Sequence, residues 1–356
     1  MKLLERTEEL QKTIVAGIMG FVVGSVIILL YGYNPVFAYK ALFSGAFGDL
    51  YSISESLANA IPLILAALTF AIGFRGGMFN IGAEGQLYLG ALAAVALNFF
   101  HLKPALTFIL ALLSAAVAGA VWSLPVAFLK VSRGVHEVIS TIMLNWISNF
   151  LAFYLITEIL VDPQRAEKTI SIVEGARFAV LVPGTSLSYG IIVAILVAII
   201  VYILIWRTVI GFDVRAMGYS PIAAAYAGIE KWKVVMIVFT AGGITAGLSG
   251  AVHVMGRPPT YAIYSGMPDI KGLGFEGLAV SMIGRNHPIG IIFASIFFGG
   301  LLSGGRMMQM IAQVPLEMVR VVEGVVVLFL AIPELIKLFS IFRRQKVTIG
   351  TGHKRL

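Results

Sequence analysis

Residues 188–206 of the chain read SYGIIVAILVAIIVYILIW, a run of 19 residues without a single charge. A helix of about 20 such residues crosses the roughly 30 Å hydrocarbon core of a bilayer. The whole chain follows this pattern, since 59% of its 356 residues are apolar, only 12% are charged and the mean hydropathy is +0.94. A soluble domain carries about 25% charged residues. The composition therefore excludes a water-soluble enzyme and predicts a polytopic membrane protein.

Apolar runs of similar length recur along the chain. We expect nine membrane-spanning helices, at 13–31, 56–74, 78–100, 104–129, 137–160, 188–206, 233–255, 288–303 and 317–339. A tenth segment, 274–284, is too short to cross by itself and is expected to be a broken or re-entrant helix. The sequence thus predicts an all-α polytopic protein with about ten transmembrane helices, one of them short or broken, in a single domain over residues 1–356.

The positions of the cations predict an orientation. With both termini in the cytoplasm and 274–284 counted as a crossing, the inner segments hold most of the 26 Lys and Arg residues. Cytoplasmic segments of membrane proteins carry such an excess. We therefore expect both termini in the cytoplasm, an extracytoplasmic loop at 161–187 and a cytoplasmic loop at 207–233. The first apolar run has no small-residue cleavage site, so an uncleaved helix is expected there.

Several classes of site are excluded or disfavoured. The net charge of +8 comes from scattered cations rather than one patch, so nucleic acid is not an expected partner. The absence of cysteine excludes disulfides and thiolate sites, and the five histidines include no pair at four-residue spacing, so no metal or other cofactor is expected. Residues 272–277 match the G-x-G-x-x-G pattern of dinucleotide-binding sites, but no strand is expected before them, so such a site is not predicted. Without a Gly-Lys dipeptide a P-loop is impossible.

Polar residues recur within two of the predicted spans. Glu137, Thr141, Asn145 and Asn149 recur every four residues, which places all four on one face of a helix. The span 233–255 repeats the spacing with Thr245, Ser249 and His253, next to glycines that allow a neighbouring backbone to come close. Because polar and ionisable groups are costly in lipid, each stripe should face either a solute path or another helix.

The span 78–100 begins with Asn80, Glu84 and Gln86 beside helix-weakening glycines. The string G-x-E-G occurs here at 82–85 and again at 274–277, each time at the start of an apolar helix. In the orientation above, the first copy starts from the inside and the second from the outside. Interrupted helices in such an inverted repeat usually border a transport path. The candidate path residues are Asn80, Glu84, Gln86, Glu137, Thr141, Asn145 and Glu276.

Four strings in the chain together resemble one family. They are GFRGGMFNIGAEGQLYLGA (73–91), GVHEVISTIMLNWI (134–147), GFDVRAMGYSPIAAAYAGI (211–229) and GFEGLAVSMIGRNHPIGIIFASIFFGGL (274–301). The chain resembles the permease subunits of bacterial and archaeal ABC importers for simple sugars, nucleosides and branched-chain amino acids. MFNIGAEGQ and the Arg-Asn-His-Pro turn are most similar to the nucleoside branch, and the chain is similar to the longer of its two permeases.

The resemblance implies an inward transporter in the inner membrane of a prokaryote, surrounded by membrane lipid. Its expected partners are an ATP-binding cassette ATPase subunit, a second and different permease that completes a heterodimer, and a lipoprotein solute receptor. The chain itself would not be an enzyme. Two departures from the family pattern are Ala225, where relatives often carry Arg, and the rather short connection 161–187.

By the same resemblance, residues 213–229 contain a coupling helix that seats in the ATPase. The residues assigned to this contact are Asp213, Arg215, Pro221, Ala224, Ala225 and Gly228. Independently of the resemblance, Ser220 suits the cap of a helix, Pro221 its first turn and Gly228 its end. The alternative for 207–233 is an ordinary basic connector.

Other functions remain open at this point. A ribose, other sugar or branched-chain amino-acid permease would share the same features. A secondary transporter could use Glu84 or Glu276 as a proton carrier, and a membrane enzyme is the most remote alternative. The solute cannot be identified from neutral polar residues, because they hydrogen-bond a purine, a pyrimidine or a sugar alike.

Overall fold

The computed structural model describes residues 2–330, with side chains described from residue 15 onward. The described chain is mostly helical, as expected of an all-α membrane protein, with one small two-stranded sheet. It divides into two compact units, Met1–Gly45 with Ser303–Leu356, and Ala46–Leu302. Each unit is described by itself, and the candidate site lies in the second one.

The first unit contains α1 (Lys2–Leu30), most of α2 (Pro35–Phe47), the end of α12 (Pro288–Ala312) and a helix at 316–330. A Cβ atom at Gly20 would lie 2.8 Å from the Cα atom of Val326, so two helices of this unit touch backbone to backbone. The sequence patterns missed α2, which is shorter than a membrane span. Of the predicted span 317–339, residues 331–339 lie outside the described residues.

The second unit is built from ten helices of very different lengths, together with short 3-10 and π-helical turns. They are α3 (Leu50–Arg75), α4 (Ala83–Ala96), α5 (Pro104–Arg133), α6 (Glu137–Tyr154), α7 (Gly190–Arg207), α8 (Val209–Tyr219), α9 (Pro221–Tyr226), α10 (Lys231–Gly256), α11 (Leu273–Ile283) and the first part of α12. Among the described residues, α3, α5, α6 with its π-helical turn Leu155–Ile159, α7, α10 and α12 are long and apolar enough to cross a membrane.

The expected helix 78–100 is shorter than predicted. Residues 76–82 are not helical, α4 begins only at Ala83, and a 3-10 turn, Leu97–Phe100, follows it. The reason is local: Gly77 adopts φ +68°, in the region that favours glycine, directly after α3 ends. At 14 residues, α4 is too short to cross a bilayer by itself, and the 11-residue α11 shares this property.

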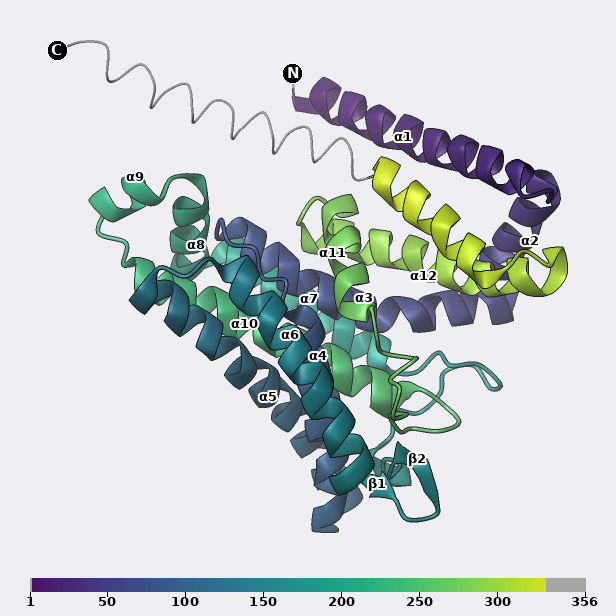
Figure 1. Ribbon diagram of the computed structural model, residues 1–356. Helices are drawn as coiled ribbons and strands as arrows, with labels where there is room; N and C mark the ends of the chain where they lie inside the picture. Colours follow the sequence, from purple (N-terminus) through teal and green to yellow (C-terminus); the bar gives the residue numbers. More distant parts are fainter. Residues whose placement is uncertain (1, 331–356) are drawn as a thin grey trace. The chain divides into compact units, whose positions relative to one another are not determined.

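A glycine stripe on α10 brings two other helices into backbone contact. A Cβ atom at Gly247 would lie 2.1 Å from the Ala115 carbonyl oxygen of α5, and one at Gly250 would lie 2.1 Å from the Leu87 carbonyl oxygen of α4. No larger residue fits these positions, which confirms the predicted close approach of neighbouring backbones. The three helices α4, α5 and α10 lie side by side in Figure 1.

Irregular segments lie at both ends of this unit. Strands β1 (Val161–Asp162) and β2 (Arg165–Thr169) form an antiparallel hairpin, at the opposite end from α8 and α9 in Figure 1. The hairpin is tied to the segment before α11, because the Thr169 amide donates to the Ile263 carbonyl at 2.9 Å. The loop 161–187 is thus partly ordered by backbone bonding to another loop.

Candidate functional site

The carboxylate of Glu84 connects the beginnings of the two short helices. Glu84 lies in the first turn of α4 and is only 4% exposed. Its Oε1 atom accepts from the Gly272 amide at 2.5 Å, and its Oε2 atom accepts from the Gly274 amide at 2.6 Å. Both amides belong to the start of α11, whose first N–H groups have no partner within the helix. Glu84 therefore caps α11 from a neighbouring helix, where the helix dipole also favours a negative charge.

The backbones of α4 and α11 touch at this junction. A Cβ atom at Gly274 would lie 2.5 Å from both the Cα and the backbone nitrogen of Glu84. Only glycine fits there. The Tyr88 hydroxyl, one turn further along α4, donates to Glu84 Oε1 at 2.5 Å. Three donors thus converge on one carboxylate.

Amide side chains hold the non-helical segment before α4. Asn80 Oδ1 accepts from the Gly82 amide at 3.0 Å and from Gln86 Nε2 at 3.3 Å. Asn145 of α6 bonds the same segment twice, because its Nδ2 donates to the Ile81 carbonyl at 2.9 Å and its Oδ1 accepts from the Gly85 amide at 3.0 Å. Backbone groups outside a helix need such partners where no water reaches them.

Other residues on the polar face of α6 also contact the non-helical segment before α4. Glu137 Oε1 accepts from the Phe79 amide at 3.3 Å, while its Oε2 accepts from Lys130 Nζ at 2.5 Å. Thr141 Oγ1 bonds the Glu137 carbonyl of its own helix at 2.7 Å, and its methyl group lies beside Gly82. The stripe of Glu137, Thr141 and Asn145 therefore faces the interior of the unit, against the break before α4.

Six of the seven candidate path residues thus come together around residues 79–86. All six are less than 9% exposed, namely Asn80, Glu84, Gln86, Glu137, Thr141 and Asn145. The seventh, Glu276, is half-buried in the first turn of α11 and takes no part in the Glu84 bonds. Among the described residues, no group of three His, Asp or Glu side chains is arranged to hold a metal ion.

The far end of α11 is tied to the end of α3. Arg75, the last residue of α3, donates from Nε to the Asn286 carbonyl at 3.1 Å and from Nη2 to the Arg285 carbonyl at 3.1 Å. Both acceptors have positive φ and form the turn that follows α11. The Arg75 guanidinium also lies 5.2 Å from the centre of the Trp206 ring. The Arg-Asn-His-Pro string therefore shapes a turn, as its sequence indicates.

The segment 207–233 forms two helices, α8 and α9. Ser220 Oγ accepts from the Ala223 amide at 3.3 Å, Pro221 is the first residue of α9, and Gly228 has φ +82° just beyond its end. Each of these local predictions is confirmed. Ile222 and Tyr226 are 72% and 91% exposed. Together with Pro221 and Ala225 they line a shallow apolar hollow on the surface of this segment.

Two neighbours assigned to the coupling contact, Ala224 and Ala225, differ in exposure. Ala224 is 3% exposed and lies against the chain itself, whereas its neighbour Ala225 is exposed. The helical period puts these two neighbours on different faces of α9. Asp213 and Arg215 are half-buried on α8, and Arg215 Nε donates to the Gly211 carbonyl of the same helix at 3.2 Å.

Sequence patterns missed several residues of the site. Tyr88 gave only a weak signal, its four-residue spacing from Glu84. Lys130, which pairs with Glu137, follows from the proximity of two charges on either side of the Gly134 turn. Gly218 gave no signal, yet a Cβ atom there would lie 2.2 Å from the Arg75 carbonyl oxygen. This contact joins α8 directly to the chain that leads into the break.

Known proteins of similar sequence support one assignment. The family model described as "Branched-chain amino acid transport system / permease component" matches residues 52–331. The chain is 37% identical to the guanosine ABC transporter permease protein NupP of Bacillus subtilis (strain 168), over 92% of this chain and 95% of that protein. It is 34% identical to the nucleoside ABC transporter permease protein NupB of Lactococcus lactis, over 93% of each chain.

Another relative is named for a different solute. The chain is 31% identical to the glucose ABC transporter permease protein TsgB13 of Haloferax volcanii, over 90% of this chain and 86% of that protein. The first two organisms each also contain a second similar permease protein, NupQ and NupC. Because the family match covers most of the chain and three relatives exceed 30% identity over at least 90% of it, the chain belongs to the permease family of ABC transport systems and is a multi-pass membrane subunit.

Proposed function

We propose that this permease carries nucleosides inward as part of a binding-protein-dependent ABC importer in the inner membrane of a prokaryote. The observation that carries the proposal is the identity of 37% and 34%, over more than nine-tenths of the chain, to permeases named for guanosine and for nucleosides. The glucose permease among the relatives makes a sugar the alternative solute. Membership of an ABC family disfavours proton coupling through Glu84, which instead caps a helix.

A test of the solute uses the receptor that serves this permease. We expect guanosine and other ribonucleosides to raise the melting temperature of the purified receptor, with ribose and glucose giving no shift. The same ranking should appear in uptake by proteoliposomes that contain the complete transporter. A shift with glucose and none with any nucleoside would contradict the nucleoside assignment and leave the permease role intact.

The partners follow from the same family. The paired names NupP with NupQ and NupB with NupC in two organisms support a heterodimer with a second permease. ATP is hydrolysed by a separate cassette subunit, and a lipoprotein receptor delivers the solute. In this assembly α8 and α9 lie in the cytoplasm, both termini are cytoplasmic, and the hairpin β1–β2 lies outside.

The two short helices are the centre of the proposed path. In ten crossings with an inverted repeat, α4 and α11 are half-length helices that run in opposite directions from a common level in the membrane. Their contact at Glu84 and Gly274 supports this arrangement. Non-helical backbone is tolerated at such depth where it is buried or lines a cavity. Residues 76–82 and Glu276 therefore border the path, while the α6 stripe keeps the break in shape.

The exposed apolar surface of α9 is the proposed contact with the ATPase. A cytoplasmic segment that exposes Ile222 and Tyr226 almost fully needs a partner to cover them. Gly218 transmits the contact, because it touches the Arg75 carbonyl at the end of α3. Glu230, at the start of α10, accepts from Lys233 and from Trp232 Nε1, and these donors hold the pKa of its carboxyl below the usual range.

A charge on α9 tests this contact. Ala225→Glu places a carboxylate on the exposed face of α9, where burial without a partner is costly. We expect normal membrane insertion, loss of ATPase co-purification and loss of uptake. Ala179→Glu makes the same change at an exposed alanine in the loop 161–187. This variant should keep both ATPase co-purification and uptake. Normal ATPase yield and uptake with the Ala225 variant would return 207–233 to the role of a basic connector.

A further inference from the structure

Among the described residues, polar side chains on one face of α10 form hydrogen bonds to α3, except at the last residue of this face, His253. The Thr69 and Thr245 hydroxyls lie 2.8 Å apart, and the Ser249 hydroxyl donates to the Pro62 carbonyl at 2.7 Å. His253 is the next residue of the same stripe and is only 7% exposed. Within the described part of the chain, its imidazole makes no hydrogen bond. A polar side chain this deeply buried is normally paired.

The opposite side of the gap, on α3, also carries polar groups that lack partners. Pro62 has no N–H, so the Ala58 carbonyl lacks the hydrogen bond that residue i+4 donates in a regular helix. Asn59 is 4% exposed, and its Nδ2 atom has no hydrogen-bond partner among the described residues. Its Oδ1 atom accepts from Arg257 Nη1 at 3.1 Å. Donors and acceptors therefore both remain unused around one space.

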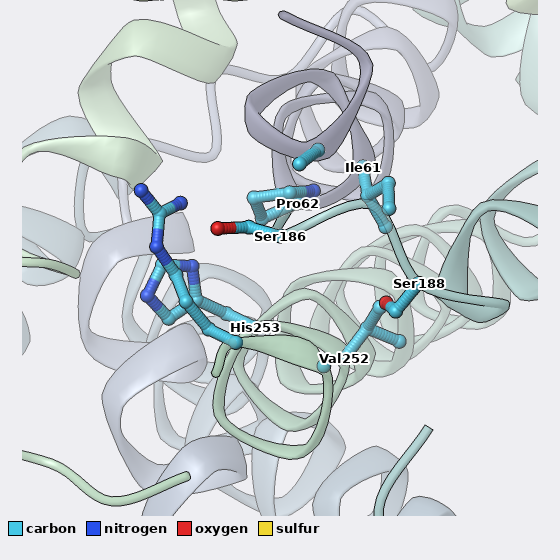
Figure 2. Close-up of a pocket in the computed structure, with 9 residues that line it drawn as sticks. Ile61, Pro62, Ser186, Ser188, Val252 and His253 are labelled. Carbon is cyan, nitrogen blue, oxygen red and sulfur yellow. The ribbon is translucent and has the colours of Figure 1, made fainter. Parts of the chain in front are cut away.

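A small pocket occupies this space (Figure 2). It is lined by Ala58, Pro62, Ser186, Ser188, His253 and Arg257, among others, and its volume is about 10 Å³. Figure 2 shows the Ser186 hydroxyl and the His253 imidazole turned toward the same space. A volume of this size holds about one water molecule, or one polar group of similar size.

One side of the pocket is formed by a loop that is bonded to the Glu55 carboxylate of α3. Glu55, one turn before Asn59 on α3, accepts from the Ser186 amide at 2.6 Å. Ser186 and Ser188 follow Gly184, which has φ +81°. The pocket thus lies between α3, α10 and a short loop.

We propose that this pocket is a solute subsite that binds one hydroxyl group of a ribose-bearing solute on its way into the path; the proposal rests on the proposed transport function. A hydroxyl both donates and accepts, so it can accept from Asn59 Nδ2 and donate to the Ala58 carbonyl or to an imidazole nitrogen. A carboxylate cannot donate to the carbonyl, and an apolar group would leave Asn59 Nδ2 and the His253 imidazole without partners.

The test is transport of deoxy analogues by the complete transporter in proteoliposomes. Guanosine and its 2′-, 3′- and 5′-deoxy forms are each supplied at concentrations that saturate the receptor, so that the maximal rate reports the permease rather than the receptor. We expect the native transporter to move one deoxy form about tenfold more slowly than guanosine, because one buried hydrogen bond is lost.

Three variants separate hydroxyl binding from a structural role. His253→Leu has a side chain of similar size that forms no hydrogen bond. It should lower the maximal transport rate of guanosine to that of the affected deoxy form, so that the ratio of the two rates falls to about one. His253→Gln retains a donor and an acceptor and should restore part of the ratio. His101→Asn changes an exposed histidine elsewhere and should leave the ratio unchanged; Asn tolerates the left-handed backbone at that position.

Either of two results overturns the subsite. The first is a native transporter that moves all four compounds equally fast. The second is a His253→Leu transporter that keeps the native ratio, including the case in which all rates fall in parallel, which is the signature of a structural role. A native transporter that moves no nucleoside contradicts the proposed function instead, and the same ratio is then measured with glucose and its deoxy forms.

Discussion

Helices α4 and α11 begin with the same four-residue pattern, but different groups hold their first turns. Before α4, residues 79–85 are bonded by Asn80, Glu137 and Asn145, which are spread over two segments of the chain. At the start of α11, Glu84 accepts from both the Gly272 and Gly274 amides. Glu276, the matching carboxylate of the second copy, lies half-buried in the first turn of α11 itself.

This asymmetry identifies α11 as the half-helix that a single change can release. Its first turn is held by one carboxylate, and its last turn by the Arg75 side chain of α3. The start of α4 keeps at least two of its three partners when any one is removed. We therefore expect the first turn of α11 to be more sensitive to a single substitution than the start of α4.

The largest effect is expected where the two helices touch. Gly274→Ala places a Cβ atom 2.5 Å from the Glu84 backbone, which cannot yield as a flexible side chain would. We expect a loss of about 3 kcal/mol or more and almost no properly assembled permease on size-exclusion chromatography. Gly324→Ala is the matched control, because nothing lies within 4 Å of a Cβ atom there. Equal yields from both variants would show that α4 and α11 are not in backbone contact.

The next largest effect concerns the cap itself. Glu84→Gln keeps the size of the side chain but leaves one acceptor oxygen for three donors, and its new NH2 group faces an N–H group. The expected loss of stability is on the order of 3 kcal/mol, seen as a lower melting temperature of the detergent-purified permease. Glu174→Gln changes an exposed carboxylate and should have little effect. A native melting temperature for the Glu84 variant would contradict the capping role.

The sequence predicted the parts of this comparison but not the contact between them. Helical periodicity placed Glu137, Thr141 and Asn145 on one face. The G-x-E-G strings marked the starts of both short helices, although 78–100 was predicted as a full span. Glu84 and Gly274 are 190 residues apart, and periodicity carries no information on which distant segment a face will meet. The pattern G-x-E-G therefore suggested two equivalent carboxylates, and it did not show that Glu84 caps the start of α11.

Short segments were predicted least well, for two physical reasons. The cap residues of α9 follow from local chemistry, since Ser, Pro and Gly act on their own backbone. Which face of α9 is exposed depends on how α8 and α9 fold back on the chain, so the sequence did not predict that Ala224 is buried while Ala225 is exposed. The helix α2 was missed because its 13 residues do not reach the length by which membrane spans are recognised.

A smaller effect is expected at the start of α4. Asn145→Ala leaves the Ile81 carbonyl and the Gly85 amide without their partners, which costs about 2 kcal/mol, while Asn80 and Glu137 still hold the segment. We expect a melting temperature between those of the native protein and the Glu84→Gln variant. Asn145→Asp sets an oxygen against the Ile81 carbonyl and a charge in a buried site, so it should be at least as destabilising as Asn145→Ala. An Asn145→Ala variant less stable than Glu84→Gln would reverse the assignment of α11 as the weaker half.

The smallest effect is expected from Tyr88→Phe. The hydroxyl of Tyr88 is one of three donors to Glu84, and its loss leaves both bonds from the carboxylate to α11 in place. The ring is 1% exposed and stays packed, so only about 1 kcal/mol should be lost. If the tyrosine instead orients the carboxylate toward α11, Tyr88→Phe and Glu84→Gln will be strongly non-additive in a double-mutant cycle of melting temperatures. A Tyr88→Phe loss as large as that of Glu84→Gln would mean that the cap depends on the hydroxyl as much as on the charge.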